Sequence, residues 1–289
     1  MTLHAPSFTI ASAAKINLAL HITGQREDGY HLLHSLVAFT DIGDLLHVAT
    51  APDHDFRIEG PFGESLPLDA GNLVVRAREK LLTLYPGLRT LRLSLEKNLP
   101  VASGIGGGSG NAAAALRAYQ TLHPEVETAH VETIARSLGA DVPMCLAQVP
   151  AIASGIGEEL VAIKNLPVLH IVMVNPGIEI STPAVYRALS SKVNPPLSPL
   201  PDDLALGSFL DWLGEQRNDL QAPALEIAPG IAPCLVALRD GGARLARMSG
   251  SGATCFGIFS TADEARQTAD AIALANPTWW VRAARTLDD

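Results

Sequence analysis

The feature that most constrains this chain is one glycine-rich loop, Pro100-Val101-Ala102-Ser103-Gly104-Ile105-Gly106-Gly107-Gly108-Ser109-Gly110-Asn111, which runs directly into four alanines. Glycine adopts backbone angles that a Cβ hinders, so successive N–H groups can turn toward one anion. The N-terminus of the helix that follows adds the positive end of its dipole. The loop therefore predicts a phosphate cradle that opens a helix, with a nucleotide as its ligand.

Spacing excludes two common glycine loops. A Walker A loop has Lys and then Ser or Thr after its last glycine, whereas Gly108 is followed by Ser109 and Gly110. A dinucleotide fingerprint that begins at Gly104 and Gly106 requires Gly or Ala at the position of Ser109. A structural turn that binds no ligand is the alternative that remains open.

Composition narrows the function classes. The 289 residues are 47% apolar, enough for two domains with real cores. With 21 basic and 30 acidic residues the net charge is −9, and no basic run marks a surface for nucleic acid or membrane. Three cysteines, far apart and odd in number, indicate neither disulfides nor zinc, and no side-chain set for a metal is expected. No signal peptide or membrane span is apparent, so we expect a cytoplasmic protein.

The pattern of apolar residues predicts a mixture of helices and strands. Strands are expected at 7–22, 45–50, 91–95, 169–174, 254–259 and 279–282. Helices are expected at 73–84 after the capping residue Asn72, at 111–122, at 129–138 before Gly139, at 202–217 and at 262–275, with a loop at 192–201. The elements follow no regular βαβ period, which favours an α+β fold. The sequence pattern changes after Ala151, where a turn with two glycines precedes new strand-like segments, so the predicted domains are 1–155 and 156–289.

Two charged residues stand out as candidates for chemistry. Lys15 lies in an apolar stretch of the first predicted strand, and a buried lysine needs an anionic partner, although strand lysines are usually solvated. Asp141 precedes Pro143 at the expected start of a helix, where a capping role is the simpler interpretation. Together with a phosphate cradle and Mg²⁺, one cation and one carboxylate make a plausible site for phosphoryl transfer.

Tyr30 and His31 follow a glycine turn, Asp28-Gly29, where an aromatic ring and an imidazole can hold a planar base. An ordinary loop aromatic is the alternative. His31 and His34 are three residues apart, but no third ligand accompanies them at a spacing typical of zinc.

Five blocks occur in the order found in one known superfamily. They are Ala14-Lys15-Ile16-Asn17-Leu18, the segment 24–31, the loop 104–109, Leu138-Gly139-Ala140-Asp141-Val142-Pro143 and Gly250-Ser251-Gly252-Ala253. Together they resemble the GHMP kinase superfamily, and the first two blocks resemble its branch that phosphorylates a CDP-linked methylerythritol. The resemblance spans nearly the whole chain.

The resemblance implies a two-domain α+β kinase with its active site in the cleft between an N-terminal ATP-binding domain and a C-terminal substrate-binding domain. It implies ATP and Mg²⁺, a small-molecule acceptor phosphorylated at its 2-hydroxyl, and a place in the non-mevalonate route to isoprenoid precursors. Lys15 and Asp141 would be catalytic. The implied ATP-binding residues are Pro100, Gly104, Ile105, Gly106, Gly107, Gly108, Ser109, Gly110 and Asn111. The implied substrate-binding residues are Asn17, Tyr30, His31, Thr182, Tyr186, Gly250, Ser251 and Gly252.

One departure from the family pattern is visible. The loop commonly carries a second serine where this chain has Gly110, so a hydroxyl that touches phosphate or Mg²⁺ in relatives is absent. Two rival functions remain: a homoserine, mevalonate or related kinase, and a catalytically silent nucleotide-binding protein. The Asp-Gly-Tyr-His block disfavours the first rival, and the presence of both Lys15 and Asp141 disfavours the second. The oligomeric state is not predicted.

Overall fold

The structure, a computed structural model, describes residues 7–288, which form two compact units. The first unit comprises the described residues before Lys15 together with Ile42–Val101 and Gly106–Gln148, and the second comprises Lys15–Asp41, Ala102–Ile105 and the described residues from Val149 onward. Two long strands, β1 (Ser7–Gln25) and β2 (His31–Thr50), contribute to both. The predicted boundary near residue 155 differs from this division, because 15–41 belongs with the second unit. The functional assignment of the two halves stays a prediction.

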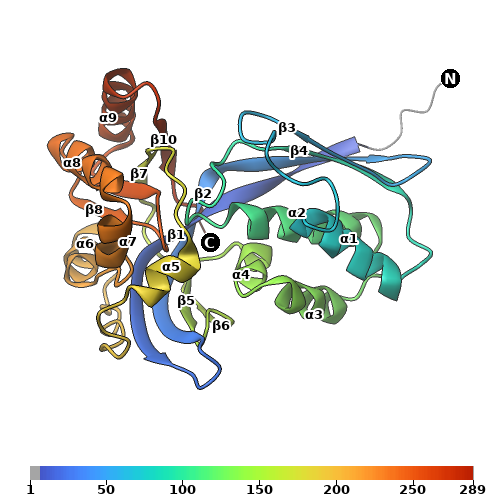
Figure 1. Cartoon of the computed structure of the whole chain (residues 1–289), viewed down its shortest axis with the longest axis horizontal. Coiled ribbons are helices and arrows are strands. Elements are labelled where there is room, and N and C mark those ends of the chain that lie inside the picture. The colour runs from blue at the N-terminus through green and yellow to red at the C-terminus, as the bar shows by residue number, and fades with distance from the viewer. Residues whose placement is uncertain (1–6, 289) are drawn as a thin grey trace. The chain divides into compact units, whose positions relative to one another are not determined.

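In the first unit, strand β4 (Leu91–Glu96) pairs antiparallel with the end of β2 and parallel with β3 (Asp55–Glu59). Alternate side chains of β4 are buried, which is the pattern that predicted a strand there. Helices lie on one face of these strands (Figure 1). They are α1 (Leu73–Leu84), α2 (Gly107–Leu122), α3 (Thr128–Leu138) and α4 (Val142–Ala147).

Local sequence explains where these helices begin. Asn72 caps α1 as predicted, since its side-chain oxygen accepts a hydrogen bond of 3.0 Å from the Val74 N–H. Helix α2 begins at Gly107, four residues before the predicted start at Asn111. The glycines misled the sequence prediction because glycine has low intrinsic helix propensity. Alanines 112–115 are fully buried, and α2 packs against α1, α3 and α4.

The second unit contains a four-stranded antiparallel sheet in the order β10-β7-β9-β8. Its strands are β7 (His170–Asn175), β8 (Leu245–Met248), β9 (Cys255–Phe259) and β10 (Trp280–Arg285). Helices α8 (Ala232–Asp240) and α9 (Ala262–Ala275) pack against it (Figure 1). The remaining elements are α5 (Thr182–Arg187), α6 (Leu206–Glu215), α7 (Gln221–Ile227), the 3-10 helix η1 (Pro229–Ile231) and the strands β5 (Ala151–Ser154) and β6 (Glu159–Ala162).

The mixed, largely antiparallel arrangement confirms the predicted α+β class. Strand β2 begins at His31, whereas the sequence predicted only its end at 45–50. The short elements α5, α7, α8, β3, β5, β6 and β8 were not predicted, because segments of four to nine residues carry little periodicity. Within residues 7–288, no single helix has the length and apolarity to span a membrane. The pair Gln221–Ile227 and Pro229–Asp240 meets those criteria only together, across a 115° bend.

Candidate active site

The glycine loop enters α2 through left-handed backbone. Gly104 and Gly106 have φ of +75° and +70°, and Gly106 is the N-cap of α2 with no side chain to cap the first turn. The first N–H groups of a helix have no partner inside it and are free to bind an anion. Gly107 begins the helix itself, so it is not a left-handed position and its need for glycine must have another cause.

Two buried polar atoms lie near this first turn without a hydrogen-bond partner among the described residues. They are Asn111 Oδ1 and Ser12 Oγ, on residues that are 3% and 0% exposed. A Cβ at Gly110 would lie 2.6 Å from Ser12 Oγ. A side chain at this position would therefore require Ser12 to move. Buried orphan acceptors and hydroxyls are uncommon, and a polar ligand at the loop would give them partners.

Asp141 is the residue from which α4 starts, and α4 packs against α2 in the first unit. Its backbone is already helical and its side chain makes no capping hydrogen bond to α4. Asp141 thus stands at the expected N-cap position without a side-chain capping hydrogen bond, and Pro143 lies in the first turn as predicted. A catalytic role for the Asp141 carboxylate stays a prediction.

In the second unit, β1 carries Lys15 and Asn17 in buried positions, 5% and 4% exposed. The expectation that this lysine lies in a buried stretch is confirmed. The Lys15 N–H donates to the Ile105 carbonyl at 3.0 Å, which fixes the end of the segment 102–105 beside β1. Asn17 donates from its side chain to Ser35 Oγ at 2.8 Å, while its Oδ1 atom is buried and unpartnered among the described residues.

The second glycine segment, 248–254, binds the first half of the glycine loop. Ser249 Oγ donates to the Gly104 carbonyl at 3.0 Å and accepts from the Asn17 N–H at 3.1 Å. A Cβ at Gly104 would collide with the Ser249 carbonyl oxygen, so the backbones approach as closely as glycine permits. The sequence prediction missed Ser249, which directly precedes the block Gly250-Ser251-Gly252-Ala253. The glycine- and serine-rich sequence that singled out Gly250, Ser251 and Gly252 also includes Ser249.

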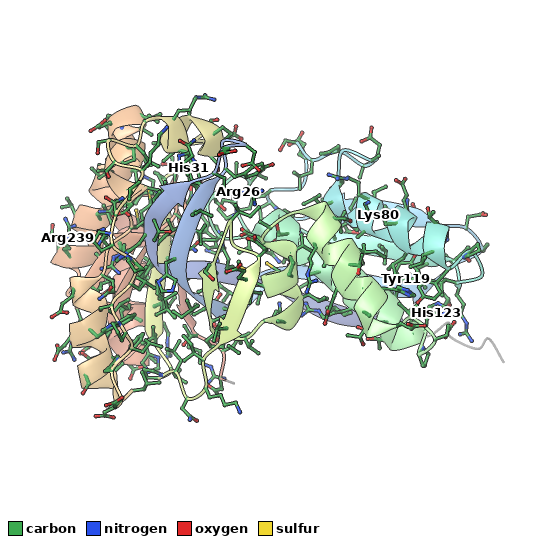
Figure 2. The ribbon with its side chains drawn as sticks, turned by 90° about the horizontal axis from the view of Figure 1, so that it is seen from below. Arg26, His31, Lys80, Tyr119, His123 and Arg239 are labelled. Carbon is green, nitrogen blue, oxygen red and sulfur yellow. The ribbon has the colours of Figure 1, made fainter. Side chains whose placement is uncertain are left out.

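Two further contacts join predicted substrate residues that are distant in sequence. Thr182 Oγ1 and Ser251 Oγ share a hydrogen bond of 2.7 Å. The rings of His31 and Tyr186 lie 4.9 Å apart between centroids and are tilted by 38°. His31 is the first residue of β2, after the turn that follows β1. Figure 2 labels His31 and Arg26 at this end of the two strands. Tyr30, in the same turn, is 60% exposed.

His31 keeps an unsatisfied ring nitrogen. Its Nε2 atom is buried and has no hydrogen-bond partner among the described residues. Burial lowers the pKa of His31, and the positive charge of Lys192 lowers it further. The imidazole is therefore neutral near pH 7, with a nitrogen able to bind the edge of a base.

Folding stability should fall as the pH drops below about 6.5. Burial is the largest cause that lowers the pKa of His21, His31, His34 and His54 from 6.5. Between that value and the lower folded values the unfolded chain binds more protons, so acid favours unfolding. Thermal melts at about pH 7.5 and about pH 5.5 test this, with a lower Tm expected at the lower pH. His34→Gln should reduce the dependence, and a Tm that rises on acidification would contradict the assignment.

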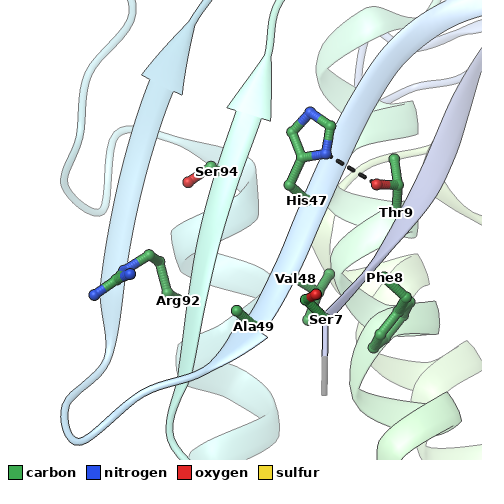
Figure 3. A pocket seen from close by; sticks show the side chains of 8 residues that line it. All are labelled: Ser7, Phe8, Thr9, His47, Val48, Ala49, Arg92 and Ser94. Carbon is green, nitrogen blue, oxygen red and sulfur yellow. Dashed lines mark hydrogen bonds between the residues drawn. The ribbon is translucent and has the colours of Figure 1, made fainter. Parts of the chain in front are cut away.

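Two surface hollows contain none of the predicted site residues. One, of about 280 Å³, lies over β1, β2 and β4 and includes the hydrogen bond of 2.9 Å between Thr9 Oγ1 and His47 Nδ1 (Figure 3). The other, of about 440 Å³, is bordered by Leu32, His34 and Asn194 in the second unit. Within residues 7–288, no three His, Cys, Asp or Glu side chains are placed to hold a metal ion.

Comparison with known proteins identifies the family. Residues 72–149 match the N-terminal domain of GHMP kinases and residues 201–277 match their C-terminal domain. The 4-diphosphocytidyl-2-C-methyl-D-erythritol kinase of Paracoccus denitrificans is 50% identical over 274 residues, covering 94% of each chain. The chain belongs to the 4-diphosphocytidyl-2-C-methyl-D-erythritol kinase family. Membership confirms the resemblance seen in the sequence and makes the protein a kinase that uses ATP.

Further relatives of this kinase agree. The Mesorhizobium japonicum protein of the same name is 48% identical over 277 residues, 95% of this chain and 94% of that one. A crystal structure of 4-(cytidine 5'-diphospho)-2C-methyl-D-erythritol kinase matches with a TM-score of 0.82 at 34% identity, covering 98% of this chain and all of the other. A homoserine kinase from Cytophaga hutchinsonii has a TM-score of 0.70 at 18% identity, covering 98% and 95% of the two chains, and shares the fold alone.

Proposed function

We propose that this kinase transfers the γ-phosphoryl group of ATP to the 2-hydroxyl of 4-diphosphocytidyl-2-C-methyl-D-erythritol, in the non-mevalonate route to isoprenoid precursors. The observation that carries the choice of acceptor is the contact between the His31 and Tyr186 rings, 4.9 Å apart. The rings of His31 and Tyr186, with the exposed Tyr30 next to His31 in the chain, can bind a planar cytosine. The acceptor of a homoserine or mevalonate kinase has no such base. Family membership supports the same acceptor.

The nucleotide is assigned to the loop from Pro100 to Asn111. The left-handed glycines and the open first turn of α2 fit the phosphates, and the orphan atoms Asn111 Oδ1 and Ser12 Oγ fit a polar ligand. Ser109, in this first turn, is the hydroxyl available to a metal ion. Mg²⁺ would supply charge neutralisation on the β- and γ-phosphate oxygens when bound there.

Lys15 and Asp141 are assigned to the reacting groups. Asp141 accepts the proton of the acceptor hydroxyl as its oxygen forms a bond to the γ-phosphorus, while the bond from that phosphorus to the bridging oxygen of ADP breaks. The Lys15 ammonium offsets the negative charge at the transferred group. Phosphoryl transfer needs positioning and charge compensation above all, and these two side chains supply both.

The residues proposed to bind the acceptor contact parts of it that are remote from the reacting hydroxyl. Tyr30, His31 and Tyr186 hold the cytosine, and Thr182 with Ser251 contacts the diphosphate. The ring contact of His31 with Tyr186 and the hydrogen bond of Thr182 with Ser251 support these two groupings. Asn17, Gly250 and Gly252 complete the substrate side next to Ser249. We also propose a cytoplasmic location, which suits three buried free cysteines, and partners limited to small molecules.

Steady-state assays with alternative acceptors test the proposal. Purified protein is mixed with ATP, Mg²⁺ and one of four alcohols: the CDP-linked methylerythritol, free methylerythritol phosphate, mevalonate or homoserine. ADP formation should be fast with the first and weak with the others, because remote binding energy positions the reacting hydroxyl. Equal kcat/KM with homoserine or mevalonate would replace the proposed acceptor. No ADP formation with any acceptor would favour a silent nucleotide-binding protein.

The base-binding residues should affect the acceptor and not ATP. His31→Ala and Tyr186→Ala should each weaken binding of the CDP-linked acceptor by about 1–3 kcal/mol, the scale of one base-stacking contact. Calorimetry with CDP measures this loss, and the KM for ATP serves as the internal control. Full affinity for CDP in both variants would remove these rings from the acceptor site.

A further inference from the structure

A buried ion pair in the first unit, absent from the predicted site, lies next to the start of α2. Asp44 on β2 and Lys97, which directly follows β4, join through Oδ2 and Nζ at 2.7 Å. The side chains are 0% and 3% exposed. Neither residue belongs to a motif that the resemblance singled out. Lys97 stands three residues before Pro100, whereas Asp44 is remote in sequence from the loop.

The pair holds the chain segment that leads into the glycine loop. Asp44 Oδ1 accepts hydrogen bonds from the N–H groups of Asn98 and Leu99, at 2.7 and 2.8 Å. Lys97 Nζ donates to the Leu99 carbonyl at 2.6 Å. Both backbone polar groups of Leu99 are thus bound by charged side chains, immediately before Pro100, where the loop begins. Hydrogen bonds to charged groups are stronger than those between neutral groups.

The same pair lies directly against the first residue of α2. A Cβ at Gly107 would be 3.2 Å from Lys97 Nζ and 3.7 Å from Asp44 Oδ2. Close approach of the helix backbone to the ammonium, and not a left-handed φ, explains glycine at this position. The Lys97 side chain consequently touches the loop at two places, its entry at Leu99 and the start of its helix at Gly107.

Stability alone is a weak reason for an ion pair in this position. Burial lowers the pKa of the Lys97 ammonium, and the charge of Asp44 opposes that effect. Apolar residues of similar volume often stabilise a protein as well as a buried pair does, because desolvation offsets the attraction between the charges. Apolar residues cannot donate or accept hydrogen bonds, so they would not hold the backbone of Asn98 and Leu99 as this pair does.

We propose that Asp44 and Lys97 are positioning residues for ATP, which fix Leu99 and Gly107 so that the first N–H groups of α2 face the phosphates. The pair acts through the loop and does not touch the reacting atoms. This inference rests on the proposed function, in which ATP binds at the same loop. It predicts a loss of ATP affinity that is larger for the triphosphate than for adenosine, with no loss for the acceptor.

The test compares four variants with the wild-type protein. Asp44→Asn combined with Lys97→Met removes both charges while leaving an Oδ1 acceptor for Asn98 and Leu99. Lys97→Arg keeps the charge but replaces the compact ammonium with a larger planar group. Lys97→Met alone leaves the carboxylate unpaired and should be the least stable variant. Leu81→Ala, which opens a cavity in the buried face of α1, is the control for destabilisation.

The measurements are Tm, the KM values for ATP and acceptor, and the affinities for ATP and adenosine. The KM for ATP should rise about tenfold in the double variant and in Lys97→Arg, as expected for the loss of one or two charge-assisted hydrogen bonds. It should be unchanged in Leu81→Ala at a similar Tm, and the acceptor KM should be unchanged throughout. Wild-type ATP affinity in the double variant and in Lys97→Arg would overturn the positioning role alone. Failure of the wild-type protein to bind ATP would overturn the proposed function itself.

Discussion

Replacement of Asp141 by asparagine is expected to lower kcat by roughly 10²–10⁴-fold, the usual loss when a general base is removed. The amide keeps the shape of the carboxylate but does not take a proton from the acceptor hydroxyl. Asp141 makes no capping hydrogen bond to α4, so the substitution leaves the start of that helix intact. Affinity for ATP and the Tm should therefore stay near their wild-type values.

Asp263→Asn is the matched control, because it makes the same chemical change on a side chain that is 80% exposed. Turnover in that variant should equal that of wild type, since exposed substitutions away from a site have small effects. Initial rates at saturating ATP and acceptor give kcat for both variants. If folded Asp141→Asn turned over within about threefold of wild type, Asp141 would have no part in proton transfer.

The second large effect is expected for Gly107→Val, which should abolish measurable ATP binding or weaken it severely. A Cβ at this position would lie 3.2 Å from Lys97 Nζ, so a branched side chain displaces the start of α2 or the ammonium. Either displacement moves the N–H groups that face the phosphates. The acceptor should still bind, because its proposed contacts belong to other residues.

Gly108→Ala provides the comparison within the same turn, because a Cβ there would meet only Leu73 Cδ1 at 3.9 Å, an ordinary contact. Calorimetry with ATP should give an affinity for this variant close to that of wild type. Unchanged ATP affinity in Gly107→Val would show that the nucleotide binds elsewhere. Equal losses in both variants would point to a general effect on the helix and not to the contact with Lys97.

Periodicity predicted those parts of the fold that carry strong local signals. Helix α1, with its Asn72 cap, and strand β4, with its alternating leucines, appear at the predicted residues. The first half of β2 was missed because residues 35–40 are all buried, so apolar and polar residues do not alternate there. The start of α2 was misplaced because glycines, poor helix formers, are retained in its first turn for close approach.

The candidate site divides in the same way. The glycines of the loop predicted a backbone that other residues resist, and the left-handed φ at Gly104 and Gly106 agrees with that expectation. The contact between His31 and Tyr186 was anticipated only through the resemblance, since no local pattern links residues so far apart. Asp44, Lys97 and Ser249 were missed because their roles depend on contacts across the fold. A lone lysine or serine at the end of a strand carries no such information.

The most direct test of the account is the identity of the product made from ATP and the CDP-linked methylerythritol. Phosphorus NMR and mass spectrometry of the reaction mixture report which oxygen has been phosphorylated. We predict one ADP per product molecule, one new phosphomonoester on the 2-hydroxyl, and an intact cytidine diphosphate linkage. A phosphoryl group on any other hydroxyl, or ADP released without a phosphorylated acceptor, would contradict the account.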